Sequence, residues 1–378
     1  MDGPRIARVE ELPAIISLAD EVFCGEGGRK LPMGRSFPYM FSEANIDNLY
    51  VTCDQGRPVS FIGTDLQDYV ACGCRIPASS IGSVCTDTQY RGRGLSSSLL
   101  QLAYRRLREK GCLIVMISGS INLYYRTGAA PGVFAMCEWT TDATALQRVD
   151  DSSLGLEPLC ESNLHDMVEL NSREPLRFDW RADWIRTMPL ALHSGDMGRG
   201  WIVRRGDKAV AAACLGVRTY GEDGFSLVDW FGDRKAVVAT LGRTLADVGV
   251  SRVHSRMVLQ DTDMFEALAV AGVTPERKIP WRWPIKVLDF AALLRALRGH
   301  LERTLGDQAD AITATECGLR VRAGGCEFAS PDETTAVQMV FAVPEVYEEK
   351  MAACPEPVRD LLAKAFPIPV RHYGLNFI

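Results

Sequence analysis

The chain has 378 residues, 47% of them hydrophobic and 24% charged, so it can bury the cores of two or three domains. Lys and Arg total 42 against 48 Asp and Glu, and the net charge of −6 gives no reason to expect a nucleic-acid partner, although it suits a cationic substrate. The N-terminus has no basic stretch followed by an apolar one, and no run of about eighteen uncharged apolar residues occurs. We therefore expect no membrane association and a cytoplasmic location.

Cysteine usage indicates a reducing compartment. The twelve cysteines stand singly inside apolar segments, no CxxC pair occurs, and only five histidines are present to join them as metal ligands. Free cysteine packs like a small hydrophobic side chain. We therefore expect buried thiols, with neither disulfides nor a metal site.

The first part of the chain alternates strand and helix patterns. Residues 6–20 favour a short strand and an amphipathic helix, and residues 48–87 alternate apolar and polar side chains as antiparallel strands do. Leucines at helical spacing follow from Leu95, and Gly111 ends that pattern before an apolar strand. This part closes near residue 140.

A second part repeats the order of these elements. From Leu154 the patterns predict strand, helix, hairpin, strand and helix again, with Gly249 in the place of Gly111. One difference is that only Gly232 stands where the first part has two glycines before its long helix. After Trp283 the pattern changes to a third, smaller α+β unit. The sequence thus predicts an α/β protein with mixed sheets and three units.

The segment TDTQYRGRGLSSSLL, residues 86–100, joins a predicted strand to the long helix. Gly92 and Gly94 permit a tight turn with close approach of the backbone, and Ser96 and Ser97 add hydroxyls in the first helical turn. A helix N-terminus has unpaired N–H groups and a partial positive charge, so this turn suits an anion, and a diphosphate in particular. The GxxxxGK[ST] loop is absent, and a dinucleotide GxGxxG loop needs glycine at Ser97. A plain turn with glycines for close packing stays the alternative.

Residues 81–131 resemble the coenzyme A motif of the GNAT superfamily of N-acetyltransferases. They hold its strand, Q/R-x-x-G-x-G/A turn, long helix, second strand and Y-x-x-x-G helix end. The resemblance implies acetyl-CoA as co-substrate, with the pyrophosphate on main-chain N–H groups of the turn and the pantetheine arm paired with a splayed strand. The implied cofactor-binding residues are Val84, Cys85 and Thr86 on the strand and Arg91, Gly92, Arg93, Gly94, Leu95 and Ser96 in the turn.

The catalytic tyrosine of the superfamily falls on Tyr124 in LYYRTGAAP, while Tyr125 fits a scaffold role. A phenol near the sulfur can protonate the departing thiolate, a contribution of roughly 10²–10⁴-fold; a packing role for Tyr124 is the alternative. Cys85 could instead carry the acyl group, but no histidine occurs in the first 160 residues to activate it. No base is singled out by the pattern, and the acidic candidates are Asp20, Glu21, Glu26 and Asp87.

The order of the units resembles a narrower group, the enhanced intracellular survival (Eis) family of acetyltransferases. That plan implies a catalytic GNAT domain over residues 1–145, a second GNAT-like domain without the glycine turn over 146–284, and a sterol-carrier-like α+β domain with a C-terminal tail over 285–378. Members acetylate amines, including those of aminoglycosides, form hexamers, and place the terminal carboxylate, here that of Ile378, in the active site. The resemblance therefore implies a small-molecule amine acceptor and a homo-oligomer.

The tail FPIPVRHYGLNFI stays apolar to its end, and its two prolines lower the cost of ordering it. It therefore predicts a docked segment, which serves either as a latch or to place the carboxylate of Ile378. We expect a CoA-dependent N-acyltransferase that acts on a small amine by direct attack in a ternary complex. Two alternatives stay open: a non-catalytic acyl-CoA sensor or scaffold, and an aminoacyl-transferase that draws on tRNA.

Overall fold

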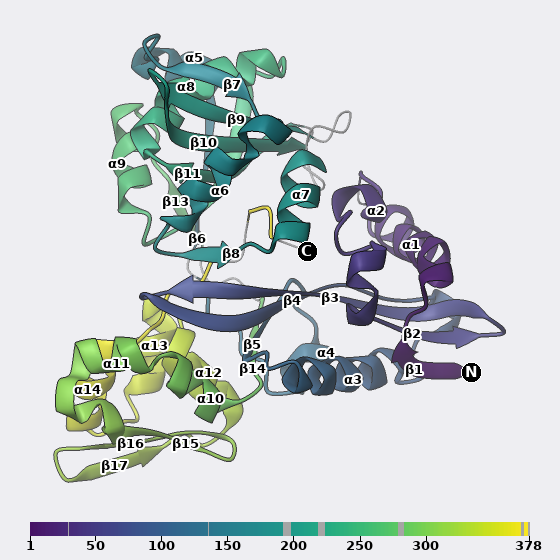
Figure 1. Ribbon diagram of the computed structural model, residues 1–378. Helices are drawn as coiled ribbons and strands as arrows, with labels where there is room; N and C mark the ends of the chain where they lie inside the picture. The colour runs from purple at the N-terminus through teal and green to yellow at the C-terminus, as the bar shows by residue number, and fades with distance from the viewer. Residues whose placement is uncertain are drawn as a thin grey trace.

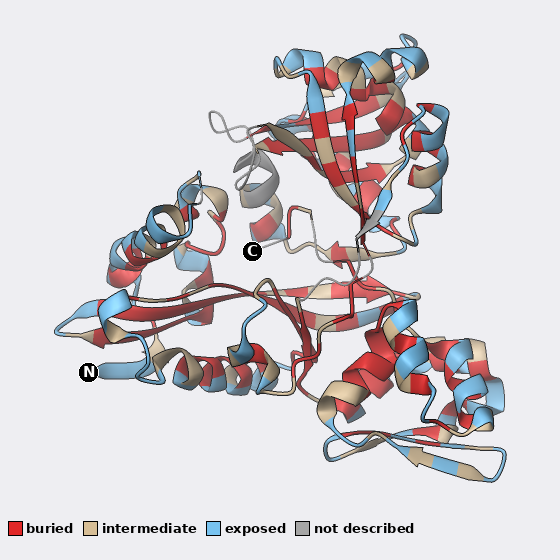
Figure 2. Cartoon of the chain, turned by 180° about the vertical axis from the view of Figure 1, so that it is seen from behind, coloured by how far each residue is buried: buried red, intermediate tan, exposed pale blue. Residues whose placement is uncertain are grey.

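In a computed structural model of the chain, the described residues contain three β-sheets, which form three lobes with their helices (Figure 1). This is the mixed α/β fold that the sequence predicts. The strands of the two larger sheets are mostly buried, while the outer faces of the helices are exposed (Figure 2). Within the described ranges, no helix is long and apolar enough to cross a membrane. The structure describes residues 1–28, 30–134, 136–191, 198–217, 224–278, 283–371 and 374–376.

The first sheet holds most of the N-terminal third of the chain. Its strands follow the order β1-β2-β3-β4-β5-β14, and all these pairs are antiparallel except β4 with β5. A further strand, β8, pairs with β3 off this path. The strands are β1 (Asp2–Ile6), β2 (Leu49–Asp54), β3 (Arg57–Ala71), β4 (Cys74–Thr86), β5 (Ile114–Ile117), β8 (Arg177–Asp179) and β14 (Ile285–Val287).

Helices cover both faces of the first sheet. α3 (Leu95–Glu109) makes the crossover between the parallel strands β4 and β5 and packs its buried Leu99 and Leu107 on one face. α4 (Asn122–Tyr125) adds to the same buried cluster. α1 (Leu12–Asp20) and the short α2 (Met33–Ser36) lie on the opposite face (Figure 1). The helix predicted from the leucine spacing is thus confirmed.

The second sheet repeats this order of elements. Its strands run β13-β6-β12-β11-β10-β9-β7, only β11 with β12 is parallel, and α8 makes the crossover there as α3 does in the first sheet. The strands are β6 (Met136–Asp142), β7 (Gly155–Pro158), β9 (Gly198–Arg205), β10 (Lys208–Val217), β11 (Phe225–Gly232), β12 (Arg252–Val258) and β13 (Glu276–Lys278). The helices are α5 (Ala143–Leu146), α6 (Leu164–Ser172), α7 (Ala182–Ala191), α8 (Arg234–Asp247) and α9 (Thr262–Val270).

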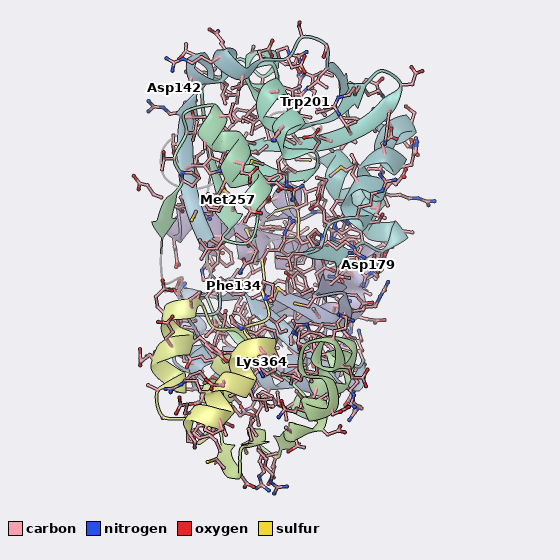
Figure 3. All side chains as sticks on the ribbon, turned by 90° about the vertical axis from the view of Figure 1, so that its left-hand side faces the viewer. Phe134, Asp142, Asp179, Trp201, Met257 and Lys364 are labelled. Carbon is pink, nitrogen blue, oxygen red and sulfur yellow. The ribbon has the colours of Figure 1, made fainter. Side chains whose placement is uncertain are left out.

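Three short strands pass between the lobes. β6 belongs to residues 1–145 by sequence, yet it pairs with β12 and β13 of the second sheet. β8 comes from the second part of the chain and pairs with β3, and β14 comes from the third and pairs with β5. Asp179, the last residue of β8, forms an ion pair with Arg75 of β4 and lies between the two larger lobes (Figure 3). Shared sheets therefore join the lobes.

The third lobe packs a three-stranded sheet, β15-β16-β17, against helices. Its core is continuous with the end of the first sheet, because Tyr69, Ile76 and Met116 belong to the same buried cluster as Leu293 and Val340. The elements are α10 (Phe290–Ala296), α11 (Arg298–Leu305), β15 (Ile312–Thr315), β16 (Gly318–Ala323), β17 (Cys326–Ala329), α12 (Glu333–Phe341), α13 (Pro344–Met351) and α14 (Glu356–Ala365).

None of the twelve cysteines, all of which are described, is in a disulfide. Most are buried as expected, but Cys160 and Cys317 are exposed. Cys160 lies where the second part begins, beside Ser162, whose hydroxyl is 3.1 Å from its sulfur. The expectation of buried thiols is therefore correct for most of these residues and wrong for these two.

The C-terminal tail runs from the third lobe into the junction of the other two. The guanidinium of Arg371 forms a buried ion pair with Asp229 of β11 at 2.5 Å, and Asp229 also accepts the N–H of Leu375 at 3.1 Å. Asn376 accepts a hydrogen bond from Trp180 Nε1 at 2.8 Å and donates one to Gln67 of β3 at 2.5 Å. The tail is thus docked as far as it is described, and Ile378 lies outside the described residues.

Asp229→Ala is expected to lower the free energy of unfolding by about 3–5 kcal/mol, because it leaves the buried guanidinium of Arg371 without its carboxylate. The double variant Asp229→Leu with Arg371→Met keeps no buried charge and should be less destabilised than the single one. Equilibrium denaturation measures both. A double variant less stable than Asp229→Ala would contradict this account of the tail.

Candidate active site

The strands β4 and β5 separate midway along β4 and form a fork. Their parallel pairing runs from Ala78 with Ile114 to Ile81 with Ile117, where β5 ends. β4 continues for five more residues to Thr86, paired with β3 on its other side. Val84, Cys85 and Thr86, which the sequence analysis singled out as a splayed strand, thus lie on the unpaired side of this fork.

A bulge in β4 coincides with the fork. Phe61 of β3 pairs with Cys85 and Gly63 pairs with Gly82, so two residues of β4, Ser83 and Val84, face one residue of β3. Ser83 has φ +54°, a left-handed conformation that a bulge can impose. Its Oγ is buried and has no hydrogen-bond partner among the described residues. Sequence reasoning missed Ser83, because a bulge depends on the pairing of two strands.

Hydroxyl groups join the end of β4 to the first turn of α3. Thr86 Oγ1 lies 2.7 Å from Ser60 Oγ and 2.8 Å from Ser96 Oγ. Arg91 Nε donates to the carbonyl oxygen of Thr86 at 3.1 Å. The strand end, the turn and the helix start are therefore held in one arrangement.

The two glycines of the turn meet a backbone requirement and leave open space. Gly92 has φ +77° and Gly94 has φ +76°. A Cβ atom built at either one would meet no described atom within 4 Å. Close packing therefore does not explain these glycines, and the space beside the N–H groups at the start of α3 is open to a ligand.

Ion pairs and a cation–π contact surround the turn. Arg91 forms an ion pair with Glu26 at 2.5 Å, and Asp87 binds Arg57 at 2.6 Å. Arg93 lies over the ring of Tyr90. These contacts fix the shape of the turn.

The acidic residues that the sequence offers as candidate bases make other contacts or are exposed. Hydrogen bonds from Thr88 and Arg91 lower the pKa of Glu26, and the N–H of Gln89 together with Arg57 lowers the pKa of Asp87. Asp20 accepts the N–H of Met33 at 2.6 Å, and Glu21 is exposed. A carboxylate with a lowered pKa is a poor proton acceptor, so the geometry favours neither Glu26 nor Asp87 as the base.

Tyr124 lies in α4, just beyond the end of β5, and is only 4% exposed. Its ring packs on Gly119, where a Cβ atom would lie 2.6 Å from Tyr124 Cε2. Burial raises the pKa of Tyr124 above its ordinary value, so its phenol holds a proton at neutral pH. Gly119 thus allows a protonated tyrosine to stand beside the fork.

Cys85 is 3% exposed, and burial raises the pKa of its thiol to about 12. The thiolate is the nucleophilic form of cysteine. At neutral pH Cys85 is therefore a protonated core residue, packed with Phe61 and Met40, and the geometry does not favour an acyl-cysteine route. No group of three His, Cys, Asp or Glu side chains suited to a metal ion occurs in the part of the chain that the structure describes.

Residues 4–132 match the family profile described as Acetyltransferase (GNAT) domain. The first part of the chain therefore contains a GNAT acetyltransferase domain. The fork, the glycine turn and Tyr124 all lie inside the matched residues. GNAT enzymes use acetyl-CoA, and a small-molecule acceptor accords with this family.

Solved structures share the fold at low identity. A GCN5-related N-acetyltransferase from Anabaena variabilis is 14% identical, covers 99% of each chain and gives a TM-score of 0.68. Eis1 from Mycobacterium abscessus is 11% identical over 97% of this chain and 96% of its own, with a TM-score of 0.60. An N-myristoyltransferase from Saccharomyces cerevisiae, solved with myristoyl-CoA, is 14% identical over 76% of this chain and 80% of its own, with a TM-score of 0.52. No curated protein sequence matches the chain.

In the second sheet, a carboxylate of the chain binds the turn that corresponds to the glycine turn of the first sheet. Gly232 donates its N–H to Glu174 Oε1 at 2.8 Å, and Arg234 donates to both oxygens of Glu174 at 2.7 and 2.6 Å. A Cβ atom at Gly232 would lie 2.3 Å from the carbonyl oxygen of Val210. Gly232 therefore serves close packing, unlike Gly94, and a carboxylate of the chain occupies the anion position.

Proposed function

We propose that this GNAT protein transfers an acetyl group from acetyl-CoA to a primary amine of a small molecule, by direct attack in a ternary complex. One observation carries the proposal: a strand fork and an open, glycine-lined helix N-terminus stand side by side in the first sheet. Tyr124, buried and protonated, places a proton donor near that fork.

The turn suits the pyrophosphate of the donor. Residues Arg91 to Ser96 bring main-chain N–H groups and the N-terminal end of α3 to one open space, where a doubly charged group is stabilised. Val84 to Thr86 offer backbone groups along the fork to the amide-rich pantetheine arm. A main-chain N–H of this strand can also stabilise the oxyanion that forms as the thioester is attacked.

Tyr124 suits the role of general acid. When the amine attacks, the C–S bond breaks and the sulfur leaves as a thiolate, to which the phenol of Tyr124 gives its proton.

We also propose the division into a catalytic part, residues 1–145, a GNAT-like part, 146–284, and a sterol-carrier-like part, 285–378, with the exchange of β6, β8 and β14 between them. Glu174 accepts the N–H of Gly232 in the turn of the second part, so we assign one CoA site per chain.

The proposal is tested by incubating the protein with acetyl-CoA and a series of amines, an alkylamine, a polyamine and an aminoglycoside, and measuring release of free thiol. Amine-dependent release supports the proposal. Binding of acetyl-CoA without turnover of any amine would favour a sensor, and absence of CoA binding would contradict the site itself.

Gly94→Asp is expected to weaken acetyl-CoA binding on the order of 100-fold relative to Gly94→Asn, because like charges about 4 Å apart near a surface repel by a few kcal/mol. Both residues tolerate the left-handed conformation of Gly94, so the pair isolates the charge. Gly249→Asp is the control, since that glycine is equally open, has φ +71° and follows α8. Calorimetric titration measures the affinities, and equal values for the two Gly94 variants would rule out a pyrophosphate there.

Tyr124→Phe is expected to keep acetyl-CoA affinity and to lower kcat by roughly 10²–10⁴-fold, because it removes only the acidic proton. Tyr125→Phe, one residue along the same short helix, should keep full turnover. Steady-state kinetics decide between the roles, and full activity of Tyr124→Phe would leave Tyr124 as a packing residue.

We propose that the carboxylate of Ile378 holds a cationic acceptor. It is supported by the docking of Asn376 on Gln67 of β3. Adding one glycine after Ile378 retains the apolar side chains and moves the carboxylate by up to roughly 3.6 Å. Turnover should fall while melting temperature and acetyl-CoA affinity stay unchanged, and unaltered turnover would assign the tail a latch role alone.

A further inference from the structure

A buried carboxylate, that of Asp65, lies on β3 beside the fork. Asp65 pairs with Ser80 of β4, one position before Ile81, where β4 and β5 part. Thr64 pairs with Ile81 next, and the pair beyond it consists of two glycines, Gly63 and Gly82. These glycines add no side chain of their own, and Met40 packs on Gly63.

The side chain of Asp65 belongs to the face of the sheet that carries α1 and α2. Strand residues alternate between faces; Phe61 packs into the cluster formed with α1, whereas Ile62 and Leu66 pack into the cluster formed with α3. Gly63 lies under Met40 on the α1 face, and Asp65 follows it on that face. The start of α7 lies on the same side of the sheet (Figure 1). There Arg181 contacts Asp65, and Asp183 contacts Tyr39.

The carboxylate of Asp65 is incompletely satisfied. Asp65 is 3% exposed, and its Oδ2 accepts a hydrogen bond from Gln67 Nε2 at 2.9 Å. Its Oδ1 has no hydrogen-bond partner in the described ranges, and Arg181 Nη2 stands 3.7 Å away. The guanidinium of Arg181 is directed elsewhere, to the carbonyl oxygen of Leu66 at 2.6 Å and to the hydroxyl of Tyr39.

The charges around Asp65 favour a cation. Asp65 and Asp183 are two carboxylates around one guanidinium, that of Arg181, and Tyr39 donates its hydroxyl proton to Asp183 at 3.0 Å. A buried acceptor without a donor is costly, and Ser83 Oγ at the fork is a second buried polar atom in the same condition. An ammonium group is a donor of the right charge for this place.

We propose that Asp65 binds the ammonium group of the acceptor and takes its proton, as the general base of the acetyl transfer. This rests on the proposed function. The acceptor enters as R–NH₃⁺ and gives one proton to Asp65, after which the nitrogen lone pair attacks the thioester carbon. The C–S bond breaks, and the sulfur takes the proton of Tyr124. The second proton lost by the nitrogen reaches the Tyr124 phenolate through water, and Asp65 releases its proton to solvent, so the products are the amide, the CoA thiol and one proton.

The protonation of Asp65 fits this role near neutral pH. Burial raises the pKa of Asp65 to about 6, against the lowering effects of Gln67, Arg181 and Trp184 and with a smaller rise from Asp183. Burial raises the pKa of the neighbouring Tyr39 as well, so that group stays neutral. Above pH 6 the carboxylate is charged and can accept a proton, and below pH 6 it is protonated and cannot. Wild-type kcat/KM should therefore fall as the pH drops through about 6.

Asp65→Asn tests the proposal, because it keeps the shape and removes the base. At pH 7.5 it should lower kcat/KM about 100-fold or more, remove the acid limb of the pH profile near pH 6, and weaken amine binding at least tenfold. Acetyl-CoA affinity and melting temperature should stay as in the wild type. Asp68→Asn is the matched control, since Asp68 is on the same strand, partly exposed and paired with Arg75, and it should keep both the rate and the pH profile.

Two outcomes would overturn the assignment of Asp65. One is an Asp65→Asn protein with unchanged turnover and amine affinity. The other is a lower rate with the acid limb still present, which would make Asp65 a structural residue. The failure of the proposed function looks different, because the wild-type protein and Asp68→Asn would then release no thiol with any amine, although they bind acetyl-CoA. That result would also remove the basis for a base at Asp65.

Discussion

The parting of β4 from β5 is the constraint on which the rest of the site depends. A strand that loses its neighbour keeps backbone N–H and C=O groups that need partners. Here the loss is built into the chain, because β5 stops at Ile117 and the bulge at Ser83 bends β4 away. The same bend brings Thr86 to Ser96 and so sets where α3 begins. Strand, turn and helix form one connected unit, so a shift of one would shift the other two.

The second sheet has the same arrangement of strand, turn and helix, but groups of the chain itself bind at the corresponding places. Its parallel pairing stops at Leu227 with Ser255, and β11 is irregular where Cys214 and Leu215 pair with Asp229 and Leu227. Beyond that point Asp229 binds Arg371 and Leu375 of the tail, and Glu174 takes the N–H of Gly232. Groups of the chain thus stand where the first sheet leaves room for a ligand. A repeated fold need not mean a repeated site.

Much of the first site could be predicted because it is local in sequence. The glycine turn, the helix after it and Tyr124 lie within about forty residues, and their spacing reflects the conformations they adopt. Partners set by distant parts of the chain could not be predicted. β8 and β14 are three residues each, too short for a period, and β3 and β5 select them in three dimensions. Gly232 matches Gly94 by position, yet only packing distinguishes them.

Asp65 illustrates the same limit at the level of one residue. In the sequence it is an acidic residue in an alternating strand, which usually indicates a solvent-facing position. Its surroundings include Arg181, more than a hundred residues later, and Gln67, which the tail contacts through Asn376. Glu26 and Asp87 are candidates that the sequence offers, but their carboxylates pair with Arg91 and Arg57.

The exchanged strands also set an order of events during synthesis. The residues that match the GNAT family leave the ribosome early, but the edge of their sheet at β5 is covered only when residues 285–287 arrive as β14. Until then β5 offers a free strand edge, the kind of surface that pairs with other chains. The first sheet is therefore completed late, and its edge at β5 is closed by the strand that leads into the third lobe.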